Sequence, residues 1–99
     1  MSPNVAIDRE ALSAFCRRHG IRRLAVFGSA LRHDFGPHSD IDVLVEFEPG
    51  RTPGLAFFAM QDELSGMLGR VADLHTPASL SRYFREEILT EAQDQYVAA

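Results

Sequence analysis

The sequence predicts one small domain in which helices cover a β-sheet, an α/β or α+β fold. Apolar residues make up 45% of the 99 residues and charged residues 24%, as in ordinary globular domains. Segments with helical spacing of apolar residues alternate with short segments whose pattern is typical of strands. A chain of this length buries one compact core and leaves no room for a second, so we expect residues 1–99 to form a single domain.

The first part of the chain is expected to run helix, strand, short helix. Asp8 can cap a helix by accepting hydrogen bonds from backbone N–H groups of the first turn. Gly20 can end that helix in a left-handed conformation. The aliphatic segment 21–27 then predicts a buried strand. A glycine and a proline limit residues 30–39 to a turn or two of helix.

Residues 41–47 carry the clearest strand signal. Side chains of a strand point alternately to its two faces, and the apolar residues that share one face here are Ile41, Val43, Val45 and Phe47. Asp40 and Asp42 therefore point together to the opposite face. Their Cα atoms would lie about 7 Å apart, close enough for the two carboxylates to converge and repel each other.

The second half predicts helix, strand, helix. Apolar residues recur with helical period over 57–68, and the segment 71–75 is a short strand that places Asp73 between apolar neighbours. From residue 79 onward the chain is expected to be helical, with an apolar stripe that closes over the sheet and consists of Ile88, Leu89, Ala92 and Tyr96. The complete predicted order is α-β-α-β-α-β-α.

Charge and cysteine content exclude several classes of protein. The formal net charge of -4 gives no overall attraction to nucleic acid or to an anionic membrane, so we expect neither as a direct partner. Cys16 is the only cysteine, which excludes an intramolecular disulfide and fits a reducing compartment. The chain also lacks a secretory signal pattern and a membrane-spanning apolar run, and we expect it to be cytoplasmic.

Two acidic residues on one strand face need a charge that offsets their repulsion. A divalent cation does this, because Mg²⁺ prefers one or two carboxylates together with phosphate oxygens and water. Gly28 and Ser29 follow a strand, where a close-approaching backbone, free N–H groups and a hydroxyl can hold a triphosphate. Asp73 on a neighbouring strand could act as a general base or complete the metal site.

Each of these features also has a plainer interpretation. A Gly28-Ser29 pair on its own is more often an ordinary turn. Asp40 can cap a turn together with Ser39, while Asp42 lies at a solvated strand end. Asp73 can be a surface carboxylate on an edge strand. It is the combination of glycine, serine and three carboxylates that favours a nucleotide site.

The four histidines do not have the spacing of zinc ligands, and we expect no zinc site. His75 differs from the others because it shares a strand face with Asp73 and could approach the phosphates or an acceptor. The default interpretation of His75 is nevertheless a structural histidine with its hydrogen bonds satisfied.

Together these motifs resemble the signature of the DNA polymerase β-like nucleotidyltransferases, and most closely the minimal nucleotidyltransferase (MNT) family. The matching residues span nearly the whole chain and are Gly28-Ser29, Arg32, Ser39 to Val45 and Val71 to Leu74. The resemblance implies the nucleotidyltransferase fold, with a small mixed sheet covered by helices. His33 departs from the glycine that many relatives have there, which affects the expected shape of the loop.

The resemblance also implies a role for each matching residue. Gly28 and Ser29 would contact the nucleotide phosphates. Asp40 and Asp42 would bind Mg²⁺, and Asp73 would be the third catalytic carboxylate and a further metal ligand. Arg32 and Ser39 are additional expected nucleotide-binding positions, and an ordinary surface arginine is the alternative for Arg32.

The function that the resemblance implies is that of an antitoxin. Members of the MNT family are commonly encoded with a helical HEPN protein, and transfer of AMP from ATP to a tyrosine hydroxyl of that toxin inactivates it. One alternative is a non-catalytic antitoxin that neutralises its partner by binding. Another is nucleotidyl transfer to a small molecule such as an aminoglycoside, although a chain of 99 residues has little surface with which to hold such an acceptor.

Overall fold

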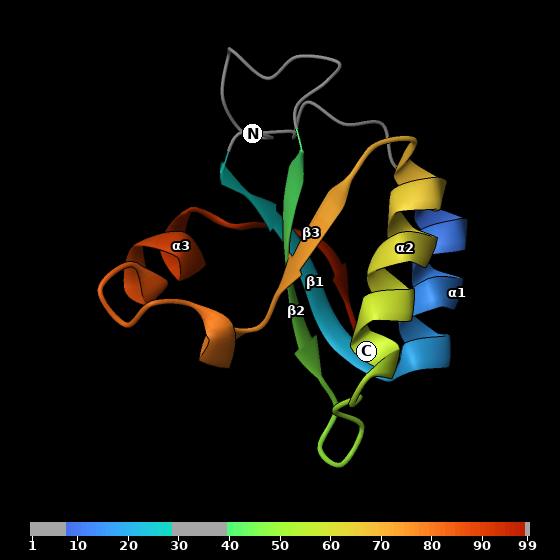
Figure 1. Ribbon diagram of the computed structural model, residues 1–99, viewed down its shortest axis with the longest axis horizontal. Helices are drawn as coiled ribbons and strands as arrows, with labels where there is room; N and C mark the ends of the chain where they lie inside the picture. Colours follow the sequence, from blue (N-terminus) through green and yellow to red (C-terminus); the bar gives the residue numbers. More distant parts are fainter. Residues whose placement is uncertain (1–7, 29–39, 99) are drawn as a thin grey trace.

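A computed structural model of the chain describes residues 8–28 and 40–98. A four-stranded sheet runs through the middle of the molecule, with α1 and α2 on one face and α3 on the other (Figure 1). In chain order the elements are α1 (Arg9–His19), β1 (Ile21–Phe27), β2 (Ile41–Phe47), α2 (Ala56–Leu68), β3 (Ala72–His75), the 3-10 helix η2 (Pro77–Ser79), α3 (Arg85–Glu91) and β4 (Gln93–Val97).

Local sequence signals set the ends of α1 as expected. The Asp8 carboxylate accepts hydrogen bonds from the backbone N–H groups of Glu10 and Ala11, at 3.0 and 3.1 Å. Gly20 ends the helix at a φ of 69°, which a residue with a Cβ atom rarely adopts. β1 begins at the next residue, so α1 folds straight back onto the sheet.

The strand order is β3-β2-β1-β4. β1 pairs antiparallel with both β2 and β4, while β2 pairs parallel with β3. The last residue of β1, Phe27, is therefore opposite Asp42 near the start of β2, and Asp42 is in turn opposite Asp73 of β3. This register brings the predicted glycine turn and two of the predicted carboxylates together at one end of the strands.

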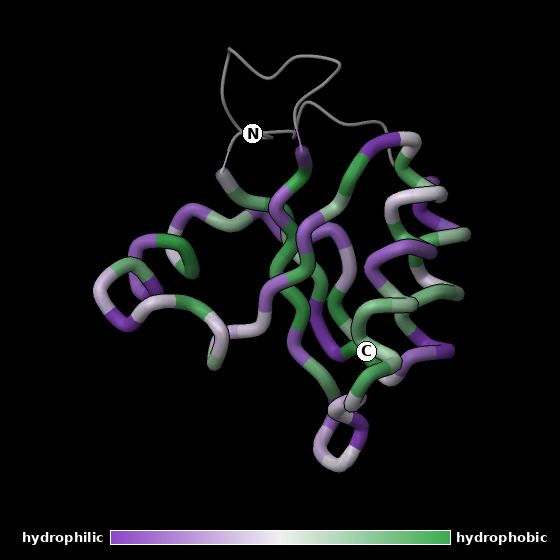
Figure 2. Tube along the Cα trace, viewed as in Figure 1, coloured by the Kyte–Doolittle hydropathy of each residue, from purple (hydrophilic) through white to green (hydrophobic). Residues whose placement is uncertain are grey.

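Two apolar clusters pack against the two faces of the sheet. The larger lies under α1 and α2 and includes the β2 residues that alternation assigned to one face, Ile41, Val43, Val45 and Phe47. The smaller lies under α3 and consists of Ala25, Phe27, Leu44 and Leu80 with Ile88, Leu89 and Ala92 packed against it. Figure 2 shows the matching alternation of hydrophobic and hydrophilic positions along the strands, and the hydrophilic turn after β2.

The prediction of a continuous closing helix over Ile88 to Tyr96 was wrong. α3 ends at Glu91, Ala92 turns the backbone to a ψ of 137°, and residues 93–97 form β4 at the edge of the sheet. The apolar stripe had combined two elements: Ile88 packs in the smaller cluster, whereas Tyr96 packs against the larger one on the other face. The short helix expected within 30–39 lies outside the described residues.

Within residues 8–28 and 40–98, every helix is too short or too polar to cross a lipid bilayer.

Candidate active site

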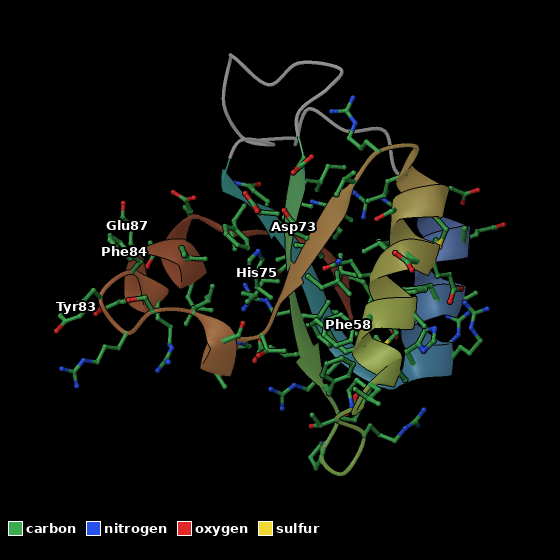
Figure 3. All side chains as sticks on the ribbon, in the orientation of Figure 1. Phe58, Asp73, His75, Tyr83, Phe84 and Glu87 are labelled. Atoms are coloured by element: carbon green, nitrogen blue, oxygen red, sulfur yellow. The ribbon has the colours of Figure 1, made fainter. Side chains whose placement is uncertain are left out.

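The candidate site lies where β1 ends and β2 begins, on the face of the sheet that α3 covers. Asp42 is near the start of β2, and its partner across the parallel pairing is Asp73 of β3. Both point away from the larger core cluster, as alternation predicted. Asp40 immediately precedes β2 and is exposed. Figure 3 shows Asp73 and His75 on β3, on the side of this strand that faces α3.

Gly28 packs directly against Asp42. Its φ is 68°, and a Cβ atom added to residue 28 would lie 2.6 Å from the Oδ2 atom of Asp42. Both facts require glycine here, because a side chain would be strained by the backbone and would displace the carboxylate. The sequence predicted a close-approaching backbone at this position, and the structure places that backbone beside a predicted metal ligand.

The electrostatic environment of Asp42 disfavours its charge. Burial raises the pKa of this carboxyl above its ordinary value, and the nearby carboxylates of Asp73 and Asp40 raise it further. His75 acts in the opposite direction and lowers the pKa. A carboxylate held partly buried beside two others is stabilised by a cation, which is the property expected of a metal ligand.

His75 contacts Asp42 from the adjacent strand. Its Nε2 atom lies 3.5 Å from Oδ1 of Asp42, and its ring packs edge-on against Phe27 at a centroid distance of 5.4 Å. The Nε2 atom is buried and has no hydrogen bond of standard geometry. The sequence placed His75 on the face of Asp73, but its proximity to Asp42 depends on the parallel pairing of β2 with β3, which the sequence did not reveal.

A pocket of about 390 Å³ opens between α3 and the sheet, where β1 ends and β2 begins. It is lined by Phe27, Gly28, Asp42, Phe84, Glu87, Ile88 and Glu91. The Gly28 N–H donates a hydrogen bond to the Glu91 carboxylate, at 3.2 Å. The contribution of α3 was not predicted, because in the sequence only the apolar stripe of this helix carried a signal, and the acidic residues resemble an ordinary solvated face.

Three of the predicted nucleotide-binding residues, Ser29, Arg32 and Ser39, lie outside the described residues. Among the residues that are described, no three His, Cys, Asp or Glu side chains converge in a way that could hold a metal ion on their own. The donor set still fits Mg²⁺, which binds through one or two carboxylates and completes its coordination with substrate phosphate oxygens and water.

Comparison with known proteins agrees with this geometry. A family model described as a nucleotidyltransferase domain matches residues 8–94, which include β1, β2, β3 and the pocket. The chain belongs to the nucleotidyltransferase domain family. Gly28 and the carboxylates of β2 and β3 are thus part of a nucleotidyltransferase domain.

Relatives of this nucleotidyltransferase include proteins described as protein adenylyltransferases. A candidate protein adenylyltransferase of Methanocaldococcus jannaschii is 38% identical over 77 residues, which are 78% of this chain and 82% of the relative. The protein adenylyltransferase MntA of Thermococcus cleftensis is 36% identical over 75 residues, 75% of this chain and 74% of that protein.

Solved structures share the nucleotidyltransferase fold. A candidate minimal nucleotidyltransferase superposes with a TM-score of 0.70 at 42% identity, covering 85% of each chain. A toxin–antitoxin complex with AMP-PNP gives a TM-score of 0.74 at 18% identity, covering 93% of this chain and 75% of the other. A complex of a tri-AMPylated HEPN toxin of Shewanella oneidensis with an MNT antitoxin gives 0.63 at 17%, covering 91% and 70%. The last two support the fold alone.

Proposed function

We propose that this nucleotidyltransferase is an Mg²⁺-dependent protein adenylyltransferase that transfers AMP from ATP to a tyrosine hydroxyl of a HEPN toxin, and so acts as its antitoxin. The observation that carries the proposal is the packing of the Gly28 turn against Asp42, with Asp73 opposite Asp42 in the register. The adenylyltransferases among its relatives, at 36% and 38% identity, support the choice of AMP as the transferred group.

In this proposal the glycine turn and the carboxylates divide the work. Gly28 and Ser29 hold the nucleotide phosphates, with Arg32 and Ser39 as further contacts. Asp40 and Asp42 would hold Mg²⁺ together with phosphate oxygens and water, with Asp73 beside them, and the bound ion would neutralise phosphate charge and the repulsion between the carboxylates. The raised pKa of Asp42 supports this assignment, since a group that disfavours its own charge gains from a cation nearby.

The reaction forms one bond and breaks one. The tyrosine oxygen attacks the α-phosphorus of ATP and a new phosphorus–oxygen bond forms. The bond from the α-phosphorus to the bridging oxygen breaks, pyrophosphate leaves, and the phenolic proton passes to the Asp73 carboxylate as general base. The AMP group adds negative charge to the toxin, which opposes binding of RNA at an adjacent site.

The intact mass of the partner tests this proposal. The chain is co-expressed with the protein encoded by the gene adjacent to its own, and the purified proteins are incubated with ATP and Mg²⁺. We expect a gain of one or more AMP units, and no gain with the double variant Asp40→Ala, Asp42→Ala. An unchanged mass together with a tight complex and an inhibited toxin would instead establish neutralisation by binding.

The small-molecule alternative is tested with the same protein preparation. We expect no AMP transfer to an aminoglycoside by the chain without its partner, because 99 residues offer little surface with which to hold such an acceptor. Efficient modification of an aminoglycoside by the isolated chain would contradict the antitoxin proposal.

A further inference from the structure

The α3 side of the pocket differs in character from the side formed by the sheet. Its apolar part consists of Phe84 and Ile88, and its charged part of Glu87 and Glu91. Of the described residues that line this pocket, none is a lysine or arginine. The α3 wall is therefore apolar and acidic.

This wall is poorly suited to hold the phosphates of a nucleotide. A triphosphate carries several negative charges, and carboxylates at close range repel it. Asp42 is assigned to the metal site, where a cation offsets its charge, and Glu91 contacts the Gly28 N–H, whereas Glu87 has neither role. The phosphates are therefore expected on the Gly28 side of the pocket, and the α3 wall is left to face the acceptor.

Two large aromatic residues extend the wall outward. Tyr83 is 78% exposed and Phe84 is 58% exposed, at the turn that leads into α3. Figure 3 shows them beside Glu87, on the opposite side of the sheet from Phe58 of α2. Exposed aromatic residues next to a pocket are typical of the central contacts of protein interfaces, where they bury a large area at a small cost in side-chain entropy.

We propose that Tyr83, Phe84 and Glu87 form the docking surface for the acceptor protein. Its occupant is a segment that presents the acceptor hydroxyl together with arginine or lysine side chains. The aromatic rings pack against this segment, and Glu87 pairs with its positive charge across the mouth of the pocket. This inference rests on the proposed adenylyl transfer to a partner protein.

Matched variants separate this surface from general surface effects. Phe84→Ala is compared with Phe58→Ala, since Phe58 is 65% exposed on the far side of the sheet. Glu87→Gln is compared with Glu86→Gln, the adjacent exposed residue of α3 that does not line the pocket. Thermal unfolding of each variant confirms that the fold is retained.

The measurement is AMP transfer to the HEPN partner, with the partner and ATP varied in turn. We expect Phe84→Ala and Glu87→Gln to lower kcat/KM for the partner about tenfold, as for a central interface residue, while KM for ATP is unchanged. The two control variants should match the wild-type chain. For Glu87→Gln the difference from wild type should shrink at high salt, because salt screens the ion pair.

Two results would overturn the docking surface while leaving adenylyl transfer intact. One is that Phe84→Ala behaves like Phe58→Ala. The other is that Phe84→Ala raises KM for ATP rather than for the partner, which would assign the α3 wall to the nucleobase. If the wild-type chain modifies no partner at any concentration, the proposed function itself has failed and the docking surface falls with it.

Discussion

Gly28 and Asp42 approach each other so closely that a Cβ atom on residue 28 would lie 2.6 Å from the Asp42 carboxylate. A glycine turn at the end of one strand thereby controls the position of an acidic side chain on the next. Since Gly28 is assigned to the phosphates and Asp42 to the metal ion that binds them, this contact sets the position of the metal ligand relative to the phosphates.

The first prediction concerns Gly28→Ala. The added methyl group is strained at a φ of 68° and displaces Asp42, so AMP transfer should fall at least about a hundredfold, as expected for misplaced reacting groups. Gly66→Ala is the control, because a Cβ atom there meets nothing within 4 Å in the last turn of α2. It should keep full activity and gain about 0.5–1 kcal/mol of stability in urea unfolding.

The second prediction separates stability from activity at Asp42. Its raised pKa means that the folded protein keeps this proton at a pH where the unfolded chain has released it. The contribution of Asp42 to the free energy of unfolding therefore falls as pH rises from the ordinary carboxyl pKa through the raised one. Asp42→Asn removes that loss.

Urea unfolding at pH 4 and pH 7 checks this. The difference in stability between Asp42→Asn and wild type should grow in favour of the variant toward pH 7, although the variant is inactive. Asp62→Asn, at an exposed position of α2, should show no such growth. A variant that is less stable than wild type at pH 7 would show that the Asp42 charge stabilises the fold.

The third prediction concerns His75, whose Nε2 atom lies 3.5 Å from Asp42. As a positioning residue it should hold the carboxylate toward the site through this contact. His75→Leu is expected to lower kcat about tenfold, typical for a residue that orients a metal ligand, with little change in KM for the partner. His75→Gln keeps a donor nitrogen and should recover part of the loss. Equal losses in both variants would mean that the ring matters only for packing against Phe27.

The fourth prediction concerns Glu91, whose carboxylate accepts a hydrogen bond from the N–H group of Gly28. We assign this N–H group to binding of the nucleotide phosphates. The carboxylate and a phosphate compete for the same donor and repel each other. Glu91→Gln should therefore lower KM for ATP about two- to fivefold, the size of a modest electrostatic contribution at a partly exposed site. Glu86→Gln should leave KM for ATP as it is. A rise in KM for Glu91→Gln would show that Glu91 assists nucleotide binding.

The sequence predicts those features of this fold that depend on local spacing. Alternation along 41–47 placed Asp42 away from the core, and the cap at Asp8 and the stop at Gly20 are determined by neighbouring residues alone. These predictions were confirmed because side-chain direction in a strand and capping in a helix follow from the backbone within a few residues.

The features that the sequence did not predict depend on pairing between distant segments. The parallel pairing that sets Asp42 opposite Asp73 and His75 near Asp42 cannot be read from either strand alone. β4 was missed because its polar residues carry no strand signal. They are stabilised by partners far away in the chain, such as the ion pair between Asp94 and Arg23 at 2.5 Å. The acidic wall of α3 became part of the site only through this tertiary packing.

The most direct test of adenylyl transfer uses ATP labelled with ³²P either at the α-phosphate or at the γ-phosphate. The chain and its HEPN partner are incubated with each nucleotide and Mg²⁺, and label on the denatured partner is counted, with Asp42→Asn as the inactive control. We predict that the partner retains the α-label and not the γ-label, and that the variant transfers neither. Two results would contradict AMP transfer at the Gly28 and Asp42 site. One is a partner that retains the γ-label, and the other is a partner that is inhibited although it carries no label.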